Sequence, residues 1–406
     1  MANKKYLVYL STDVGDTLVG YLTSQIKGTK ESAGFQYDQT WLESPHAFGL
    51  APDLPLAPGM FFSKDKMFGA FEDCAPDRWG RKLMIRYEQE LATIESRPQK
   101  TLNEIDYILR VNDFARQGAL RFKEAENGEF LTTTVSGAVP PLTKLPELLH
   151  AAEAINDKTD TNKELLLLLA PGSSLGGARP KASVVDDNNN LCIAKFPKKD
   201  DDTRVVVWEA IALDLARRCG LNVPDFQFKS IMNKDVLIIK RFDRQGTTRI
   251  PFASAMTMLN AIDNDMNTYN YTEIADFLIQ NGAKPDEDLV ELWKRIVFSV
   301  LISNTDDHLR NHGFLHINKG WILSPLYDVN PSAEKTDTFH TAIAEDNATA
   351  SIENALQYAK YFRISAPEAT TIVNSMTTVI SNWQNVAKHY GLPQAEITRM
   401  SPAFKV

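Results

Sequence analysis

The sequence predicts an α+β fold with a β-rich N-terminal part and an all-helical C-terminal lobe, and two patterns support this class. Apolar and polar residues alternate in "KKYLVYLSTDVGDTLVGYLT" on both sides of Gly15-Asp16, which predicts a β-hairpin. After Pro251 the chain changes to helical patterns, as in "YTEIADFLIQNG", "DEDLVELWKRIVFSVLISN", "SIENALQYAKYF" and "PEATTIVNSMTTVISNWQNVAKHYG". The 406 residues, of which 43% are hydrophobic, are enough for two or three domains with real cores.

Between these regions, local signals predict a mixture of helices and strands. A helix is predicted in "FEDCAPDRWGRKLMIRYEQELA", because Pro76 suits a first turn and Trp79, Leu83 and Ile85 lie near helical spacing. The polar run "DDNNN" between the β-prone segments "KASVV" and "LCIAKF" predicts a second hairpin. "RVVVWEAIALDLARRCGLNVP" follows as a helix that ends at Gly220, and "KDVLIIKRFDR" as another strand.

The turn-rich connector around Pro140-Pro141 predicts a domain boundary. We therefore expect an N-terminal domain over residues 1–140, a β-rich lobe over residues 141–245 and a helical lobe over residues 246–406. The net charge of −8 argues against strong direct binding of nucleic acid, so a DNA contact would need a basic partner. Three widely spaced cysteines without a CxxC pair predict reduced thiols in the cytoplasm. No apolar run is long enough to predict a signal peptide or a transmembrane helix.

The segment "SNTDDHLRNHGFLHIN" allows two interpretations. His308, His312 and His316 are spaced four residues apart, so on a helix they would share one face, as a metal site could require. Asp306 and Asn311 have the spacing of the catalytic Asp and the metal-binding Asn in a protein-kinase catalytic loop. Three histidines over two helical turns would spread about 12 Å, too far for one ion with ligand bonds of about 2 Å. A glycine also interrupts the pattern, and "HGFLHIN" is typical of a strand, so the second interpretation is favoured.

A Gly/Ser-rich loop, "PGSSLGGARPKA", is a candidate for binding phosphate. Its glycines, among them Gly176 and Gly177, permit a close approach of backbone N–H groups to phosphate oxygens. It is not a Walker A loop, because Ala178 and Arg179 stand where that motif requires its lysine and its serine or threonine. A plain turn before a strand is the alternative.

Further charged residues complete a phosphoryl-transfer set in the order found in kinases. Lys195 lies in the predicted strand "LCIAKF" and Glu209 in the next helix is its natural partner; a lysine that reaches solvent and a glutamate on a solvated face are the alternatives. Asp328, in "LSPLYDVNPS", stands where a kinase has a Mg²⁺ ligand, unless it only forms a turn. Asp306 would accept the proton of a substrate hydroxyl, and His308 could contact the transferred phosphate or brace the loop.

These motifs together resemble HipA-like serine/threonine kinases, the toxin components of bacterial type II toxin–antitoxin pairs. "NTDDHLRN" is similar to the catalytic loop of that family, "YDV" to its metal-binding Asp motif and "SSLGGARPKA" to its phosphate loop. "AKFP" is similar to its nucleotide-lysine segment and "KRFDR" to its hinge, while "APDRWGR" and "ARQGALRF" are similar to landmarks of its N-terminal domain. The resemblance implies a two-lobed protein-kinase-like fold that uses ATP and Mg²⁺.

The resemblance also implies a role for each matching residue. Asp306 matches the catalytic base, with His308 beside it, and Asn311 and Asp328 match the Mg²⁺ ligands. Ser174 matches a loop serine that such kinases phosphorylate on themselves, with the neighbouring Ser173 as the alternative. The residues expected at the nucleotide are Ser174, Gly176, Gly177, Ala178, Lys181, Lys195, Glu209, Arg241 and Phe242.

Two residues depart from the family's pattern. Asp307 stands where a small residue is common, and it would raise the pKa of Asp306 if the two carboxylates face each other. Lys240 stands at the hinge where some relatives carry an acid, so adenine would be bound by backbone groups around Arg241 and Phe242.

The function that the resemblance implies is that of a cytoplasmic protein kinase. Its target would be a serine or threonine of a translation protein, such as an aminoacyl-tRNA synthetase, and it would inactivate itself by loop phosphorylation. A small helix-turn-helix antitoxin similar to HipB would neutralise it and carry it to DNA, where the pair would repress its operon. The alternatives are a small-molecule phosphotransferase of the same fold and a non-catalytic corepressor module.

Overall fold

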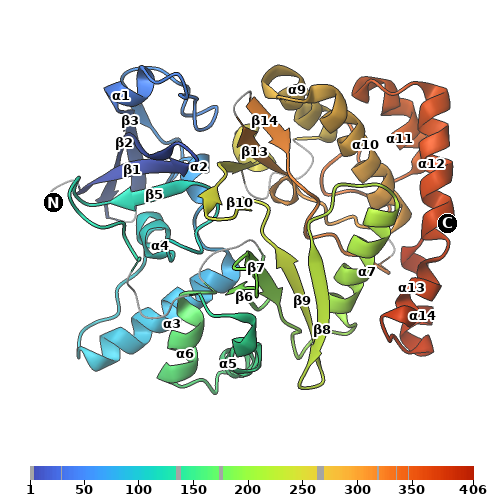
Figure 1. The fold of residues 1–406 in the computed structure, drawn as a ribbon, viewed down its shortest axis with the longest axis horizontal. Coiled ribbons are helices and arrows are strands. Elements are labelled where there is room, and N and C mark those ends of the chain that lie inside the picture. Colours follow the sequence, from blue (N-terminus) through green and yellow to red (C-terminus); the bar gives the residue numbers. More distant parts are fainter. Residues whose placement is uncertain are drawn as a thin grey trace. The chain divides into compact units, whose positions relative to one another are not determined.

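The computed structural model describes residues 4–28, 30–133, 139–172, 177–262, 269–317, 320–334, 336–345 and 347–406. The predicted α+β class is confirmed, since the N-terminal region is rich in strands and the C-terminal part is mainly helical (Figure 1). Among the described helices, none is both long enough and apolar enough to cross a membrane.

The chain forms two compact units. The first unit comprises Met1–Asp200 and Lys229–Ala253, and the second unit comprises Asp201–Phe228 and Ser254–Val406. Two short strands, β8 (Phe226–Ile231) and β12 (Phe252–Ser254), lie where the chain passes from one unit to the other. The boundaries predicted at residues 140 and 245 remain predictions.

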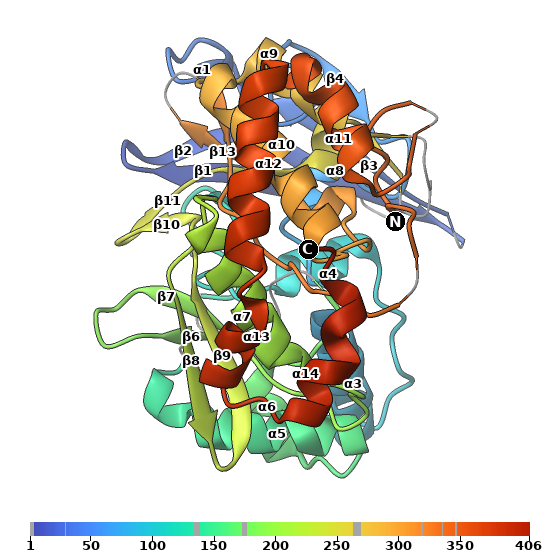
Figure 2. The same cartoon turned by 90° about the vertical axis from the view of Figure 1, so that its right-hand side faces the viewer.

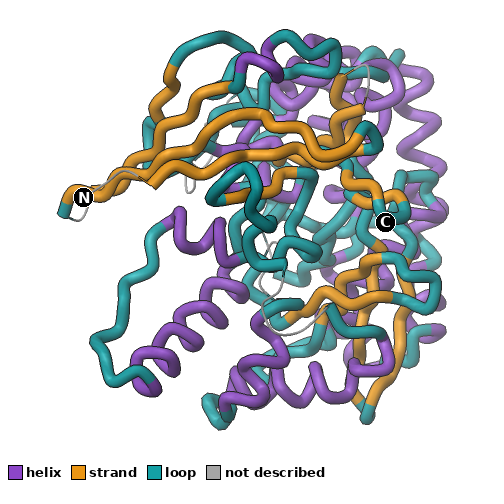
Figure 3. The backbone as a smooth tube through the Cα atoms, turned by 60° about the vertical axis from the view of Figure 1, so that its left-hand side comes forward, coloured by secondary structure: helices purple, strands orange, loops and turns teal. Residues whose placement is uncertain are grey.

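A five-stranded antiparallel sheet, β4-β3-β2-β1-β5, opens the first unit (Figure 3). The hairpin predicted around Gly15-Asp16 is its β1–β2 pair, and Gly15 has a φ of 103°, which suits glycine. Val8, Leu22 and Phe35 are completely buried in the core beside this sheet. The strands are β1 (Lys4–Thr12), β2 (Gly15–Lys27), β3 (Lys30–Tyr37), β4 (Met60–Phe62) and β5 (Leu120–Lys123).

The prediction of a single helix in "FEDCAPDRWGRKLMIRYEQELA" is wrong at the start of this segment. The segment forms two helices, and the second begins only after Asp77, whose Oδ1 accepts a hydrogen bond from the Gly80 N–H at 2.7 Å. An N-cap of this kind ends the preceding turn, so Pro76 lies outside the helix. Of the three apolar residues used to predict this helix, Trp79 and Leu83 are buried, whereas Ile85 is 40% exposed. The helices of this unit are α1 (Gln39–Leu42), α2 (Gly69–Glu72), α3 (Arg78–Ile94), α4 (Glu104–Arg110), α5 (Leu145–Asp157) and α6 (Asn162–Leu169), with a 3-10 turn, η1, at Leu142–Lys144.

A second antiparallel sheet in the first unit contains β6, β7 and β9. The predicted "DDNNN" hairpin is confirmed as its β6–β7 pair, and Asn189 in the turn has a φ of 59°. Trp79 of α3, Leu148 of α5 and Leu168 of α6 pack with the apolar residues of this sheet in one core. The strands are β6 (Lys181–Val185), β7 (Leu191–Lys195) and β9 (Lys234–Lys240), followed by the short hairpin β10 (Arg244–Gln245) and β11 (Thr248–Arg249).

The second unit is mainly helical, and α12 packs against α10 (Figure 2). Gly220, with a φ of 74°, follows the end of α7 as predicted, whereas the predicted long C-terminal helix is interrupted between α12 and α13. The unit also contains a β13–β14 hairpin, so this lobe is not entirely helical. The elements are α7 (Val205–Arg218), α8 (Ala255–Met258), α9 (Tyr271–Asn281), α10 (Pro285–Leu301), η2 (Leu309–Asn311), β13 (Gly313–Ile317), β14 (Gly320–Leu323), α11 (Ile352–Tyr358), η3 (Ala359–Phe362), α12 (Ala366–Ile380), α13 (Trp383–His389), α14 (Gln394–Met400) and η4 (Ser401–Ala403).

Candidate functional site

The segment that carries Asp306 begins where α10 ends. Ser303 adopts a left-handed backbone, with a φ of 52°, and turns the chain out of the helix. The Asn304 N–H donates to the carbonyl of Ser299 at 2.8 Å, and its Nδ2 lies 3.3 Å from the Ser299 hydroxyl. The last turn of a buried helix therefore fixes the start of the candidate catalytic loop.

Asp306 and Asn311 are brought together by one tight turn. The chain forms the 3-10 turn η2, and the Asn311 N–H donates to the His308 carbonyl at 2.8 Å. Asn311 Nδ2 lies 3.5 Å from the Asp306 carbonyl oxygen. The Asp306 side chain is exposed, whereas Asn311 is buried. The Asp306 side chain is thus exposed to solvent, and the Asn311 amide lies against the backbone of Asp306.

The segment that carries Asp328 is fixed against the same loop. The Tyr327 hydroxyl donates to the Arg310 carbonyl at 2.7 Å, and the Asn330 N–H donates to Asn304 Oδ1 at 3.2 Å. Asp328 itself has a φ of 54°, a conformation uncommon for a residue other than glycine that often occurs at functional sites. Asp328 and Asn311 offer carboxylate and amide oxygens, the hard ligands that Mg²⁺ prefers, so this donor set fits the expected metal.

Asp307 points away from solvent, unlike its neighbour Asp306. It is 5% exposed, accepts a hydrogen bond from the Tyr271 hydroxyl, and has its Oδ1 3.2 Å from His312 Nε2. Burial disfavours its charged form, but His312 and the Tyr271 hydroxyl outweigh burial and hold the pKa of Asp307 below its ordinary value. The two carboxylates therefore occupy different environments, one exposed and one buried against Tyr271 and His312, rather than facing each other.

Replacing Asp307 by Asn is expected to lower the free energy of unfolding by about 1–3 kcal/mol, because a buried charged acceptor is lost beside Tyr271 and His312. The adjacent exposed residue supplies the control, since Asp306→Ala should cost no more than about 0.5 kcal/mol. Urea denaturation of both variants measures the difference. Equal costs for the two variants would contradict the buried role of Asp307.

The three histidines lie in separate environments rather than on one helix. His312 is completely buried, facing Asp307, and His316 lies on β13, where burial lowers its pKa to about 4 and its ring contacts Trp321 with 5.0 Å between centroids. His308 precedes η2, and its ring lies 5.8 Å from that of His340. Within the described ranges, no group of three or more His, Cys, Asp or Glu side chains is placed to hold a metal ion.

The first unit contains the predicted nucleotide lysines. Lys195 is the last residue of β7 and pairs in register with Lys181 of β6. Lys181 forms an ion pair of 2.7 Å with Asp77, and both side chains are buried. Asp77 was not among the residues predicted for the site. The motif "APDRWGR", which contains it, is the one sequence feature that pointed to this position.

Three other predicted residues of the Gly-rich loop, Ser173, Ser174 and Gly176, lie outside the described residues. Gly177 has a φ of 107° and Ala178 is exposed. At Gly177 the backbone therefore has a conformation that favours glycine.

Glu209 lies in α7 of the second unit and is 3% exposed, so the alternative that placed it on a solvated face is wrong. Its pairing with Lys195, which belongs to the first unit, remains a prediction.

The predicted hinge carries a buried charge cluster. The Arg241 side chain donates to Asp243 and to the Ala115 carbonyl, and its backbone N–H donates to the Leu191 carbonyl at 2.9 Å. These contacts commit the Arg241 side chain to the fold, while Phe242 follows it directly. The prediction that backbone groups here bind adenine stays a prediction.

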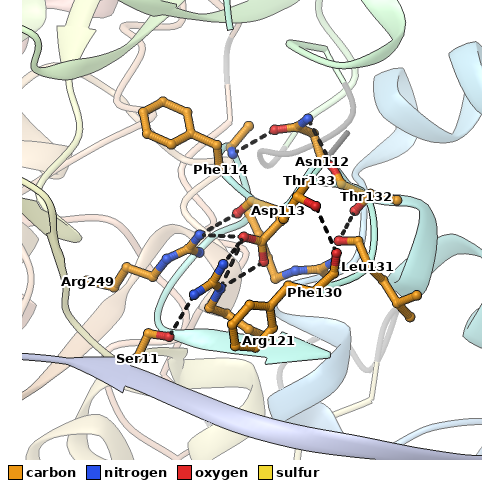
Figure 4. A network of polar contacts seen from close by, with 12 residues as sticks. Ser11, Asn112, Asp113, Phe114, Arg121, Phe130, Leu131, Thr132, Thr133 and Arg249 are labelled. Atoms are coloured by element: carbon orange, nitrogen blue, oxygen red, sulfur yellow. Dashed lines mark hydrogen bonds and ion pairs between the residues drawn. The ribbon is translucent and has the colours of Figure 1, made fainter. Parts of the chain in front are cut away.

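A second cluster ties the β10–β11 hairpin to the N-terminal sheet. Figure 4 shows Asp113 between two arginines: Arg121 Nη2 lies 2.7 Å and Arg249 Nη2 lies 3.2 Å from its Oδ2. Arg121 belongs to β5 and Arg249 to β11. Arg121, in the segment "ARQGALRF", thus belongs to a cluster that joins parts of the first unit that are distant in sequence.

Asp306, Asn311 and Asp328 lie on adjoining loops of a mixed α+β fold, the arrangement expected of a kinase-like protein. The chain belongs to the HipA-like family. The HipA-like C-terminal domain matches residues 173–383, and the HipA N-terminal domain matches residues 10–104.

The similar proteins are related at low identity. "Putative kinase Y4mE" of Sinorhizobium fredii is 22% identical over 337 residues, which cover 77% of this chain and 74% of that protein. A "Putative kinase" of Haemophilus influenzae is 24% identical over 221 residues, which cover 47% of this chain and 64% of that protein. The solved complex of HipA, HipB and operator DNA from Shewanella oneidensis MR-1 matches with a TM-score of 0.63 and 16% identity, over 98% of this chain and 94% of the matched chain. This last likeness shows a shared fold.

Proposed function

We propose that this protein is an ATP- and Mg²⁺-dependent serine/threonine protein kinase of the HipA type. The observation that carries the proposal is the single turn that exposes Asp306, with Asn311 behind it and Asp328 in a left-handed conformation on the adjoining segment. The family membership and the relatives described as kinases support it.

The residues of the turn take separate roles in this proposal. Asp306 orients the substrate hydroxyl and accepts its proton, which its exposure permits. Asn311 and Asp328 hold Mg²⁺, which when bound neutralises charge on the phosphates of ATP. His308, whose Nδ1 has no hydrogen-bond partner within the described part of the chain, would contact the transferred phosphate or brace the loop beside the base. Lys195, Lys181 and the Gly-rich loop bind the nucleotide.

The proposed biology follows the family. The substrate is a serine or threonine of a cytoplasmic translation protein, such as an aminoacyl-tRNA synthetase, and Ser174 is a site of self-phosphorylation. A phosphate on Ser174 would add about −1.5 to −2 charges where ATP phosphates bind, so nucleotide binding would weaken. A HipB-like antitoxin is the proposed partner, supported by the HipA, HipB and operator DNA complex among the solved structures. With a net charge of −8, this chain would reach DNA through that partner.

The proposal predicts that ATP turnover depends on Mg²⁺ and on Asp328. Asp328→Ala removes one of two protein ligands, so the Mg²⁺ concentration for half-maximal turnover should rise at least about tenfold, the lower end of the effect of disturbing a metal site. A Mg²⁺ titration of ATP turnover, for wild type and variant, measures this. Identical curves, or wild-type turnover that persists in EDTA, would contradict the metal-dependent kinase.

A further inference from the structure

Helix α3, which lies in the N-terminal part of the chain, lies close to Gly172, near the start of the Gly-rich loop. The Gly172 N–H donates to the Leu168 carbonyl at 2.7 Å. A Cβ at this position would lie 2.6 Å from Leu83 Cδ1 and 3.2 Å from Trp79 Nε1, both in α3. The same Cβ would lie 2.8 Å from the Leu168 carbonyl oxygen of α6, so glycine lets the chain pass closely between α3 and α6 here.

The same helix also contacts Lys181, near the end of the loop. Trp79 Nε1 donates to the Lys181 carbonyl at 3.0 Å. Lys181 Nζ lies 2.7 Å from Asp77 Oδ2, and the two side chains are 3% and 5% exposed. The other oxygen of Asp77 accepts from the Gly80 N–H and caps α3, so one carboxylate joins the helix start to the lysine.

The lysine held by Asp77 lies at the glycine end of the loop. A Cβ on Gly177 would lie 3.0 Å from Lys181 Nζ. Lys181 and Lys195 are directly opposite each other in the β6–β7 pair, so their side chains leave the same face of the sheet. Like charges in such a pair repel, and Asp77 supplies the compensating charge.

The Asp77–Lys181 ion pair is not expected to contribute much to the stability of the fold. Burial raises the pKa of Asp77 even though Lys181 opposes that shift, so removing the carboxylate from water is costly. Buried ion pairs of this kind often add little net stability. The pair also joins two family domains, because Asp77 lies in the region matched by the N-terminal domain and Lys181 in the region matched by the C-terminal domain.

We propose that Asp77 is a positioning residue of the nucleotide site: it orients Lys181 toward the phosphates of ATP, and Trp79 holds the Lys181 backbone through its hydrogen bond to the carbonyl. The N-terminal α3 thereby sets the affinity for nucleotide. This inference rests on the proposed kinase function, and it concerns binding rather than phosphoryl transfer.

The test compares full-length variants for ATP affinity, by calorimetry with Mg²⁺, and for kcat. Asp77→Asn keeps an N-cap acceptor but loses the charge, so the Kd for ATP should rise about tenfold with kcat changed less than about twofold. Asp77→Glu should recover part of the affinity. Lys181→Met should weaken ATP binding at least as much, and the Asp77→Asn, Lys181→Met double variant should not be additive, since the two residues act as one unit.

Glu88→Gln is the matched control, because Glu88 is a buried carboxylate of the same helix that pairs with Arg97 at 2.6 Å and Arg110 at 3.3 Å. It should lower the unfolding temperature without changing the Kd for ATP. An unchanged Kd in Asp77→Asn, or an equal rise in Glu88→Gln, overturns the positioning role. If Asp77→Asn does not fold, Trp79→Phe removes the other contact that positions Lys181, the hydrogen bond to its carbonyl, and should also raise the Kd. If wild type and Asp77→Asn bind ATP equally well, the positioning role of Asp77 is refuted and the kinase proposal stands. If wild type binds no ATP, the kinase proposal is refuted as well.

Discussion

Asp306→Ala is expected to lower the rate of phosphoryl transfer by about 10²–10⁴-fold, the range typical for loss of a positioned general base. The reason is geometric. The Asp306 side chain is exposed, so a substrate hydroxyl can reach it, while the Asn311 amide contacts the Asp306 backbone. Substitution of an exposed side chain should change the stability by no more than about 0.5 kcal/mol. The loss should therefore appear in kcat, with the Kd for ATP and the unfolding transition unchanged.

Mass mapping after incubation with ATP and Mg²⁺ gives a direct readout of this variant. Wild type should acquire phosphate in the peptide that contains Ser174, and Asp306→Ala should not. Asp286→Asn is a suitable control, because Asp286 is an aspartate of the same unit with an 80% exposed side chain at the start of α10. Phosphate on Ser174 in purified Asp306→Ala would argue against self-phosphorylation. Wild-type kcat in Asp306→Ala would exclude it as the base.

The parts of the candidate site that could be predicted are those encoded over a few residues. The five-residue interval from Asp306 to Asn311 could be recognised from the sequence, and in the structure the short 3-10 turn η2 at Leu309–Asn311 lies within it. The strand character of "HGFLHIN" also followed from residue type, and it separated the histidines that a helix would have aligned. For Asp328, its place in the chain order could be predicted, but its left-handed backbone, with a φ of 54°, could not.

Other features depend on residues far apart in the sequence, which no local pattern connects. Asp77 and Lys181 are separated by 104 residues, and Gly118 and Asp243 by 125. A charged residue among apolar ones predicts that some partner exists, but not which one. Asp307 illustrates the same difficulty, because its partner Tyr271 lies 36 residues away and turns its carboxylate from solvent into the interior.

Asp243→Ala should lower the free energy of unfolding by about 3–5 kcal/mol, because it leaves buried arginines without their counter-charge. Asp243 is 3% exposed, and three groups converge on it. Its Oδ1 accepts from Arg241 Nε at 2.7 Å, and its Oδ2 accepts from Arg244 Nη1 at 2.8 Å and from the Gly118 N–H at 2.7 Å. One carboxylate thus joins the segment after β9 to the segment before β5, and urea denaturation of the variant measures its contribution.

The pH dependence of the free energy of unfolding distinguishes the contribution of the Asp243 charge from that of its packing. Burial alone would raise the pKa of Asp243, but Arg241 and Arg244 outweigh burial and hold it well below its usual range. Such a carboxyl contributes stability above its unfolded-state pKa of about 3.9, and that contribution is lost as the pH falls through the lower folded-state pKa. The difference between wild type and Asp243→Ala should therefore be full at neutral pH and shrink progressively below about pH 4.

Asp157→Ala provides the comparison, because it removes an ion pair with Lys199 whose side chains are 41% and 75% exposed, and it should cost at most about 1 kcal/mol. If Asp243→Ala cost no more than this, or if its cost were the same at pH 3 and pH 7, the stability would not come from the buried charge. The arginines would then have to be satisfied by the backbone carbonyls that already accept from them, those of Ala115 and Arg116.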